Sequence, residues 1–214
     1  SGYKISGTAL TINSSGTYEV SGSCPDGSIK VKKGTEGVNL ILDGITLASS
    51  DTAPLCFNKS SEVTLTANEN TVNTFADTEK NNDDNYADNE NAENAVIKCK
   101  DGSDVIIDGS GTINITANGK NGIKSGAATE DEGDAFIIID GPVLNINAPV
   151  NDAVNAENLL TVKSGTLNIS AEDDALHSDY KLVIGDADEK GAPDINISSC
   201  YEGLEGANVE IYSG

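Results

Sequence analysis

Short runs of alternating apolar and polar residues, interrupted by glycine, cover most of the chain. Four paired runs show this most clearly, at residues 38–42 and 45–47, 105–107 and 112–115, 136–139 and 143–146, and 160–162 and 166–169. Alternation with a period of two is typical of strands that turn one face toward a core. No stretch combines a helical period with capping residues, so we predict an all-β protein.

A polar corner and a short motif follow the strand pairs and make the pattern a repeat. The motif begins with an oxygen-bearing residue, followed by Gly or Ala and usually an aliphatic residue. Its first position is occupied by Thr52, Asn94, Asn121, Asp152, Asp174 and Glu202. Asp174 follows Asp152 by 22 residues, and three short strands in a unit of that length are typical of a parallel β-helix. A meander of hairpins is the alternative, but the constant offset of the apolar residues favours a single β-helix domain over residues 1–214.

Three polar segments interrupt the repeat, near residues 76–93, 127–134 and 186–193. Insertions in a repeat protein emerge as loops where strands meet. The first is acidic and rich in Asn, and its length suits either a flap over a groove or a disordered loop.

The chain is strongly acidic. Its 35 Asp and Glu residues outnumber 13 Lys, and the net charge is −22. The negative electrostatic potential of such a chain repels nucleic acid and anionic membranes. In addition, no apolar run is long enough to span a membrane. We therefore expect a monomer that binds neither, and that binds an anionic ligand only where cations cancel the field.

The repeat predicts a file of carboxylates, which we call the acid ladder: Asp152, Asp174 and Glu202. Equivalent residues in neighbouring strands lie about 4.8 Å apart, where two unit charges repel by about 3.5 kcal/mol at an effective dielectric of 20. A calcium ion takes six to eight oxygen ligands and would offset this repulsion. Further candidate ligands for several calcium ions are Asn121, Asn151, Asn155, Glu157, Asp173, Asp179 and Glu205. The alternative is a solvated acidic edge without metal.

Four residues near the acid ladder are candidates for contact with a bound sugar. Lys124 and His177 occupy one position of the repeated motif, whereas Tyr180 and Tyr201 flank the ladder. His177 has no nucleophilic partner at a recognisable spacing, so we expect no catalytic residues. The four cysteines lack metal-ligand spacing, and they are either free thiols or include a bridge between Cys56 and Cys99.

The motifs at residues 94–98, 121–125 and 173–179 resemble the repeat of the cellulose- and acid-sugar-binding β-helix proteins of cellulolytic bacteria. These carbohydrate-binding domain-containing proteins are similar in fold to pectate lyases, especially the family 9 polysaccharide lyases. The resemblance covers residues 36–212. It implies a right-handed, single-stranded, pectate-lyase-like parallel β-helix that carries several calcium ions and binds cellulose and uronic-acid polymers such as polygalacturonate. It also implies a location outside the cell or on its surface. No leader peptide is visible, and the abrupt start at Ser1 is consistent with a leader that has been removed.

The resemblance to pectate lyases raises a second hypothesis, a calcium-dependent lyase with a Lys base. The bases near the acid ladder are Lys98, Lys124 and Lys181. Surrounding acids raise the pKa of a lysine and oppose its action as a base at neutral pH, so we favour a non-catalytic binding protein. A structural module of the cell surface is the third possibility.

Overall fold

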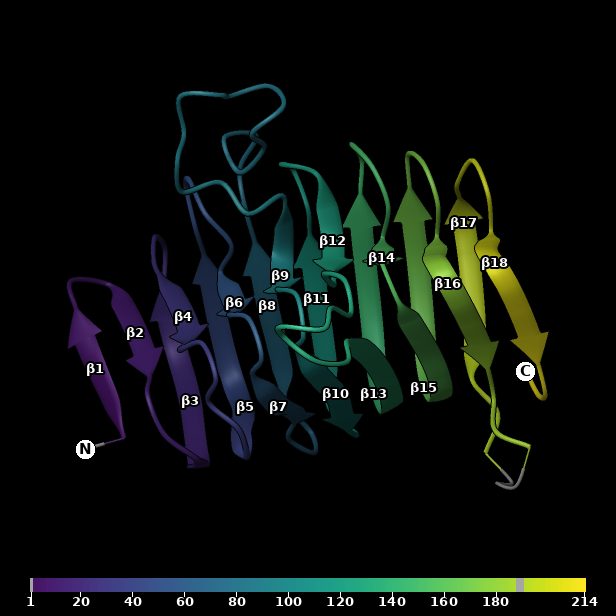
Figure 1. The fold of residues 1–214 in the computed structure, drawn as a ribbon, viewed down its shortest axis with the longest axis horizontal. Coiled ribbons are helices and arrows are strands. Elements are labelled where there is room, and N and C mark those ends of the chain that lie inside the picture. Colours follow the sequence, from purple (N-terminus) through teal and green to yellow (C-terminus); the bar gives the residue numbers. More distant parts are fainter. Residues whose placement is uncertain (1, 188–190) are drawn as a thin grey trace.

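The computed structural model describes residues 2–187 and 191–214, and within them the chain forms strands and no helix. The described part accordingly contains no helical segment suited to crossing a bilayer. The strands are β1 (Tyr3–Ser6), β2 (Ala9–Ile12), β3 (Gly16–Cys24), β4 (Ser28–Val31), β5 (Val38–Ala48), β6 (Leu55–Phe57), β7 (Glu62–Ala67), β8 (Val72–Ala76), β9 (Ala95–Cys99), β10 (Asp104–Gly109), β11 (Thr112–Thr116), β12 (Asn121–Lys124), β13 (Phe136–Ala148), β14 (Val154–Ala156), β15 (Leu159–Ala171), β16 (Leu176–Ile184), β17 (Asp194–Ser199) and β18 (Leu204–Ile211). The two termini lie at opposite ends of the long axis (Figure 1).

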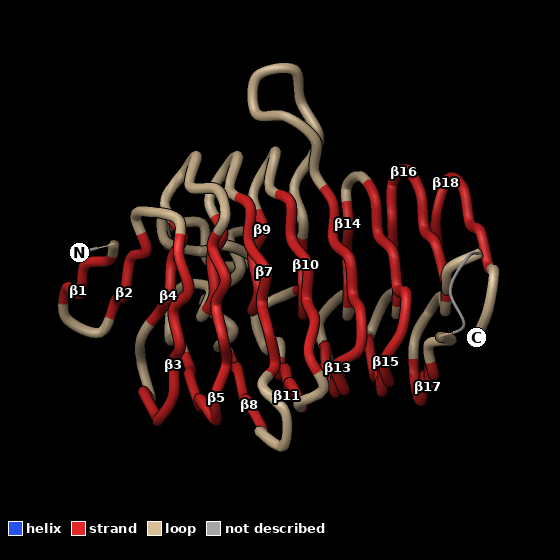
Figure 2. The backbone as a smooth tube through the Cα atoms, turned by 90° about the horizontal axis from the view of Figure 1, so that it is seen from below, coloured by secondary structure: helices blue, strands red, loops and turns tan. Residues whose placement is uncertain are grey.

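The strands form one mixed sheet, and the prediction of a single right-handed parallel β-helix is wrong. β1 and β2 pair in antiparallel orientation, although the later strand pairs are parallel. Chain lengths between paired positions are also unequal, because Val63 pairs with Val105 whereas Leu160 pairs with Leu182. The insertions therefore break the 22-residue period that a regular solenoid requires, and loops of different size leave the strands (Figure 2).

Parallel pairs are arranged in three lines, which fix the positions of the outward-facing side chains. The first line runs through β5, β7, β10, β13, β15 and β16. The second runs through β5, β8, β11, β13, β15 and β17, so β5, β13 and β15 are long enough to belong to both. The third runs through β4, β6, β9, β12, β14, β16 and β18 and carries the acid ladder at its C-terminal end.

Glycine bends long strands without ending them, although the sequence pattern predicts two short strands separated by a glycine turn. β13 continues through Gly141 and β15 through Gly165, which have φ angles of 110° and 100°. A Cβ atom at Gly165 would lie 2.5 Å from the carbonyl oxygen of Pro142 in the neighbouring strand. Only glycine combines this φ angle with so close an approach of two backbones.

The core consists of aliphatic side chains that alternate with outward-facing polar ones. Leu65, Ile107, Ile139 and Val162 occupy paired positions in the first line and are fully buried. The apolar pattern of the sequence therefore identifies the inward face correctly, because one residue of slip would turn each strand's apolar side chains to water.

The four cysteines are free thiols, so the alternative of a bridge between Cys56 and Cys99 is not realised. Cys56 lies opposite Lys98, and Cys99 lies opposite Phe57. Because neighbouring positions of a strand face opposite sides, this register separates the two thiols.

The insertion near residues 76–93 projects beyond the strands between β8 and β9 (Figure 1). Its first part is anchored to the body of the protein, since Asp77, Asn81 and Asn82 are buried. The second insertion, near residues 127–134, contacts the strands through Glu132. The carboxylate of Glu132 accepts hydrogen bonds from Lys33 at 2.6 Å and Ser60 at 2.7 Å. Residues 188–190 of the third insertion lie outside the described residues.

Candidate metal centre

Backbone hydrogen bonds stack the acid ladder on the turns that precede β14, β16 and β18. The amide of Ala153 donates to the carbonyl of Asp174 at 2.9 Å, and the amide of Ala175 donates to the carbonyl of Glu202 at 2.9 Å. The Gly or Ala after each acid therefore holds the next acid in register. The repeated motif predicts this alignment because its copies are equivalent positions of parallel strands.

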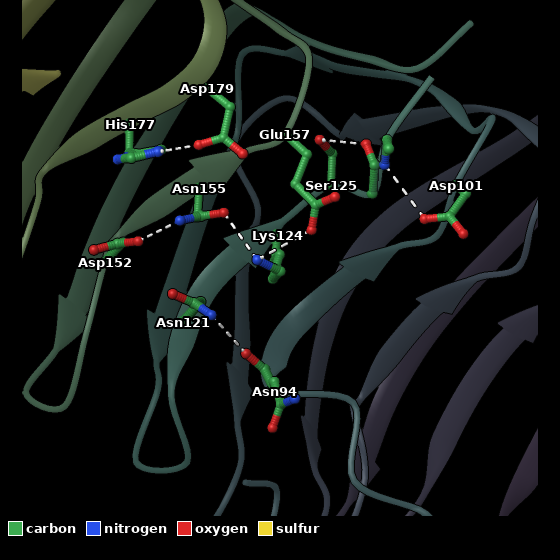
Figure 3. Close-up of polar contacts among 12 residues, drawn as sticks. Asn94, Asp101, Asn121, Lys124, Ser125, Asp152, Asn155, Glu157, His177 and Asp179 are labelled. Carbon is green, nitrogen blue, oxygen red and sulfur yellow. Dashed lines mark hydrogen bonds and ion pairs between the residues drawn. The ribbon is translucent and has the colours of Figure 1, made fainter. Parts of the chain in front are cut away.

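A second row of side chains lies beside the acid ladder. Lys124, Asn155, His177 and Glu205 occupy paired positions in β12, β14, β16 and β18. Lys124 donates to the Oδ1 atom of Asn155 at 3.0 Å, and the amide of Asn155 donates to Asp152 (Figure 3). The two rows are thus connected across the strands.

The two rows enclose a cleft of about 510 Å³. Its lining comprises Lys124, Asp152, Asn155, Glu157, Asp173, Asp174, His177, Asp179, Tyr201, Glu202 and Glu205. Seven of these side chains are carboxylates, whereas Lys124 and His177 are the cationic ones. The cleft therefore attracts cations.

Asp152 and Asp174 are the most buried acids of the cleft, with 3% and 5% of their surface exposed. The Oδ1 atom of Asp152 accepts a hydrogen bond from the amide of Asp174 at 3.1 Å. In contrast, the Oδ1 atom of Asp174 is buried and accepts no hydrogen bond. A buried carboxylate oxygen without a partner costs about 1–3 kcal/mol or more, and a bound cation would remove this cost.

His177 lies between carboxylates and supplies part of the missing positive charge. Its Nδ1 atom contacts Asp174 at 3.1 Å and also Glu205. Its Nε2 atom contacts Asp179 at 2.7 Å (Figure 3). Burial lowers the pKa of the ring, but these three carboxylates outweigh it and raise the pKa to about 9. The sequence predicts His177 as a sugar contact and does not predict this role, although its place in the row between Asn155 and Glu205 indicates an acidic neighbour.

The pKa values of two acids reflect the crowding of charge. Burial, followed by the hydrogen bond to Glu205, raises the pKa of Asp174. Burial, followed by the charges of Asp174 and Asp152, raises the pKa of Asp173. Both shifts mean that ionising these carboxylates costs free energy in the protein without a cation.

Two overlapping groups of side chains have the geometry to hold a divalent cation. One consists of Asp174, Glu202 and Glu205, and the other of Asp152, Asp174 and His177. Within each group the candidate ligand atoms lie within 4.8 Å of one another. The first group offers only oxygen atoms, which calcium prefers, so the residues fit the ion inferred from the sequence.

The remaining candidate residues fall into two sets. Glu157 lies 3.5 Å from Lys124 and lines the cleft together with Asp173, Asp179 and Tyr201. In contrast, the side chains of Asn121, Asn151 and Tyr180 do not line it. The Asn151 amide donates to Asn121 at 2.8 Å, and the Asn121 amide donates to the carbonyl of Asn94 at 2.9 Å, so these amides stabilise the adjoining turns.

Comparison with known proteins identifies the family. The family model for carbohydrate-binding domain-containing proteins matches residues 6–209. The chain belongs to this family. A carbohydrate-binding domain-containing protein of Acetivibrio thermocellus is 31% identical over 123 residues, which are 57% of this chain and 42% of that relative. The chain thus matches less than half of the relative's length.

A solved structure supports the fold. The polysaccharide lyase-like protein from C. thermocellum, determined as a gadolinium derivative, superposes with a TM-score of 0.68. The match covers 98% of this chain and 90% of that one at 22% sequence identity. At this identity the likeness extends to the arrangement of strands alone.

Proposed function

We propose that this carbohydrate-binding protein holds acidic polysaccharides, such as uronic-acid polymers, through calcium ions in the cleft, without cleaving them. The observation that carries the proposal is the buried Oδ1 atom of Asp174, which has no partner in a cleft with seven carboxylates. An ion at this atom would satisfy the oxygen and offset the repulsion between Asp174, Glu202 and Glu205.

Calcium would also make an acidic cleft compatible with an acidic ligand. Asp174, Glu202 and Glu205 supply fewer oxygens than the six to eight that calcium takes, so positions remain for sugar carboxylates and hydroxyls. The exposed ring of Tyr201 lies at the edge of the same cleft and could stack on a sugar.

The proposal extends to cellulose and to a location outside the cell or on its surface. This extension is supported by the membership of the chain in a family of carbohydrate-binding domain-containing proteins. Cellulose has no carboxylates, so it would not depend on the calcium in the cleft.

The proposed function is tested by retention on polygalacturonate gel. We expect the protein to be retained in millimolar Ca²⁺ and released by a chelator, because the ion joins protein and sugar carboxylates. Magnesium and zinc, tested separately, measure the selectivity of the cleft. Equal retention with and without chelator would contradict a calcium bridge, and no retention under any condition would favour a purely structural module.

A polysaccharide lyase is the second candidate. The observation that favours it is the position of Lys98, which lies opposite Lys124 where β9 pairs with β12. Burial, followed by the charge of Lys124, lowers the pKa of Lys98, as a lysine base requires. Lys181 does not meet this requirement, because the hydrogen bond between Lys181 and Glu210 raises the pKa of Lys181.

The lyase is tested by ultraviolet absorbance, which detects the unsaturated uronides that elimination releases. If the protein is a lyase, absorbance rises with polygalacturonate and Ca²⁺ at alkaline pH, and Lys98→Gln abolishes the rise. We expect no rise with the wild-type protein, and a rise that Lys98→Gln removes would overturn the non-catalytic proposal.

A further inference from the structure

A groove of about 640 Å³ lies on the second line of strands, away from the acidic cleft. Four strands line it: β11, β13, β15 and β17. Its lining consists of Asn, Ile, Thr and Ser side chains and includes no charged residue. On a chain with a net charge of −22, an uncharged groove of this size is suited to an uncharged ligand.

A row of amides runs through the groove, which we call the amide row: Asn114, Asn145, Asn168 and Asn196. These residues occupy paired positions in the four strands. The amide of Asn145 donates to the Oδ1 atom of Asn114 at 2.8 Å, and the amide of Asn168 donates to Asn145 at 2.8 Å. The amide of Asn196 donates to Asn168 at 3.3 Å, which completes the chain of bonds.

These bonds leave part of each amide available. A side-chain amide has two hydrogens and two lone pairs, and the row uses one of each between neighbours. Asn168 and Asn196 are exposed and Asn114 and Asn145 are half-buried. Water would therefore satisfy the hydrogen bonds of these amides even if the amides did not bond to one another. The mutual bonds instead hold the amides in one orientation, which lowers the entropy that a ligand must overcome.

A second uncharged row lies next to the amide row. Thr116, Asn147 and Ser170 occupy paired positions two residues further along β11, β13 and β15. Both rows repeat at the strand spacing of about 4.8 Å. A ligand that fits them repeats along its length and carries groups that both donate and accept hydrogen bonds, as sugar hydroxyls do.

From this geometry we infer that the groove is a second binding site, which takes an uncharged polysaccharide across the strands independently of calcium. The inference rests on the proposed function in that the ligand is a carbohydrate, but it assigns the uncharged ligand to its own site. A protein partner fits less well, because the groove offers neither charge nor an aromatic side chain.

The test uses amorphous cellulose as the uncharged probe and the double variant Asn145→Asp/Asn168→Asp. The variant keeps the side-chain shape but removes two donors and adds two charges. We expect retention on cellulose to fall roughly tenfold or more, since each lost sugar hydrogen bond weakens binding about fivefold. Retention on polygalacturonate in Ca²⁺ should remain, and a chelator should not release the wild-type protein from cellulose.

Two further variants keep the test decisive. Asn85→Asp/Asn91→Asp adds the same charge at exposed positions of the insertion and should bind cellulose as the wild type does. Asn168→Ala removes one exposed amide without adding charge and should weaken binding roughly fivefold.

Three results would overturn the inference: no retention of the wild type on cellulose, undiminished retention of the Asn145→Asp/Asn168→Asp and Asn168→Ala variants, or equal loss in the Asn85→Asp/Asn91→Asp control. Asp174→Asn separates the two sites. It should lose retention on polygalacturonate and keep retention on cellulose, so that failure at one site is distinguishable from failure at the other.

Discussion

Replacing Asp174 with Asn is expected to abolish the rise in melting temperature that Ca²⁺ produces in the wild-type protein. Asp174 belongs to both candidate metal groups, and its buried Oδ1 atom has no partner. A ligand at 100 times its dissociation constant stabilises a protein by about 2.7 kcal/mol. For a chain of this size that corresponds to a rise of roughly 5–10 °C.

The same substitution should leave the calcium-free protein as stable as the wild type or slightly more stable. Burial and the contact with Glu205 raise the pKa of Asp174, so its ionised form costs free energy without a cation. The measurement is thermal unfolding with Ca²⁺ and with a chelator. Asp88→Asn removes one charge from an exposed position and should keep the full response to Ca²⁺. An Asp174→Asn variant that Ca²⁺ still stabilises would contradict the assignment of Asp174 as a ligand.

The acid ladder could be predicted from the sequence because its order depends on register alone. Asp152, Asp174 and Glu202 each precede a Gly or Ala and an aliphatic strand, and the backbone bonds of Ala153 and Ala175 hold that register. Burial at Asp152 and Asp174 is less evident from the sequence, since it depends on the turns around them.

The regular β-helix could not be predicted correctly because the 22-residue period holds for only some of the strand pairs. Asn168 follows Asn145 by 23 residues, but Asn145 follows Asn114 by 31 because the second insertion lies between them. The sequence pattern therefore conceals the amide row, although the structure aligns its members.

The first insertion is expected to lose its anchor when Asp77 is replaced by Ala. Asp77 is 3% exposed, and its Oδ1 atom accepts from the amides of Asn118 at 2.7 Å and Gly119 at 3.0 Å. Its Oδ2 atom accepts from the side chain of Asn81 at 2.8 Å. Asp77→Ala leaves these three donors without their acceptor, at a cost of about 1–3 kcal/mol for each donor that water does not reach.

We therefore expect Asp77→Ala to lower the melting temperature by roughly 6–12 °C, on the basis of about 3 kcal/mol and a chain of this size. Limited proteolysis should cut within residues 77–94 of the variant before the rest of the chain. Asp88→Ala, at an exposed position of the same insertion, is the control and should change neither measurement. Unchanged melting and proteolysis of Asp77→Ala would show that these bonds do not anchor the insertion.

This anchor also concerns the cleft, because Asn118 and Gly119 lead directly into β12. That strand carries Lys124, whose amine bonds to Asn155 beside Asp152. If the insertion holds the turn before β12, Asp77→Ala should also weaken retention on polygalacturonate in Ca²⁺, whereas a flap that only covers a groove would leave the turn intact. Its buried first part favours the former role, in which the acidic insertion fixes the start of the row that borders the candidate metal centre.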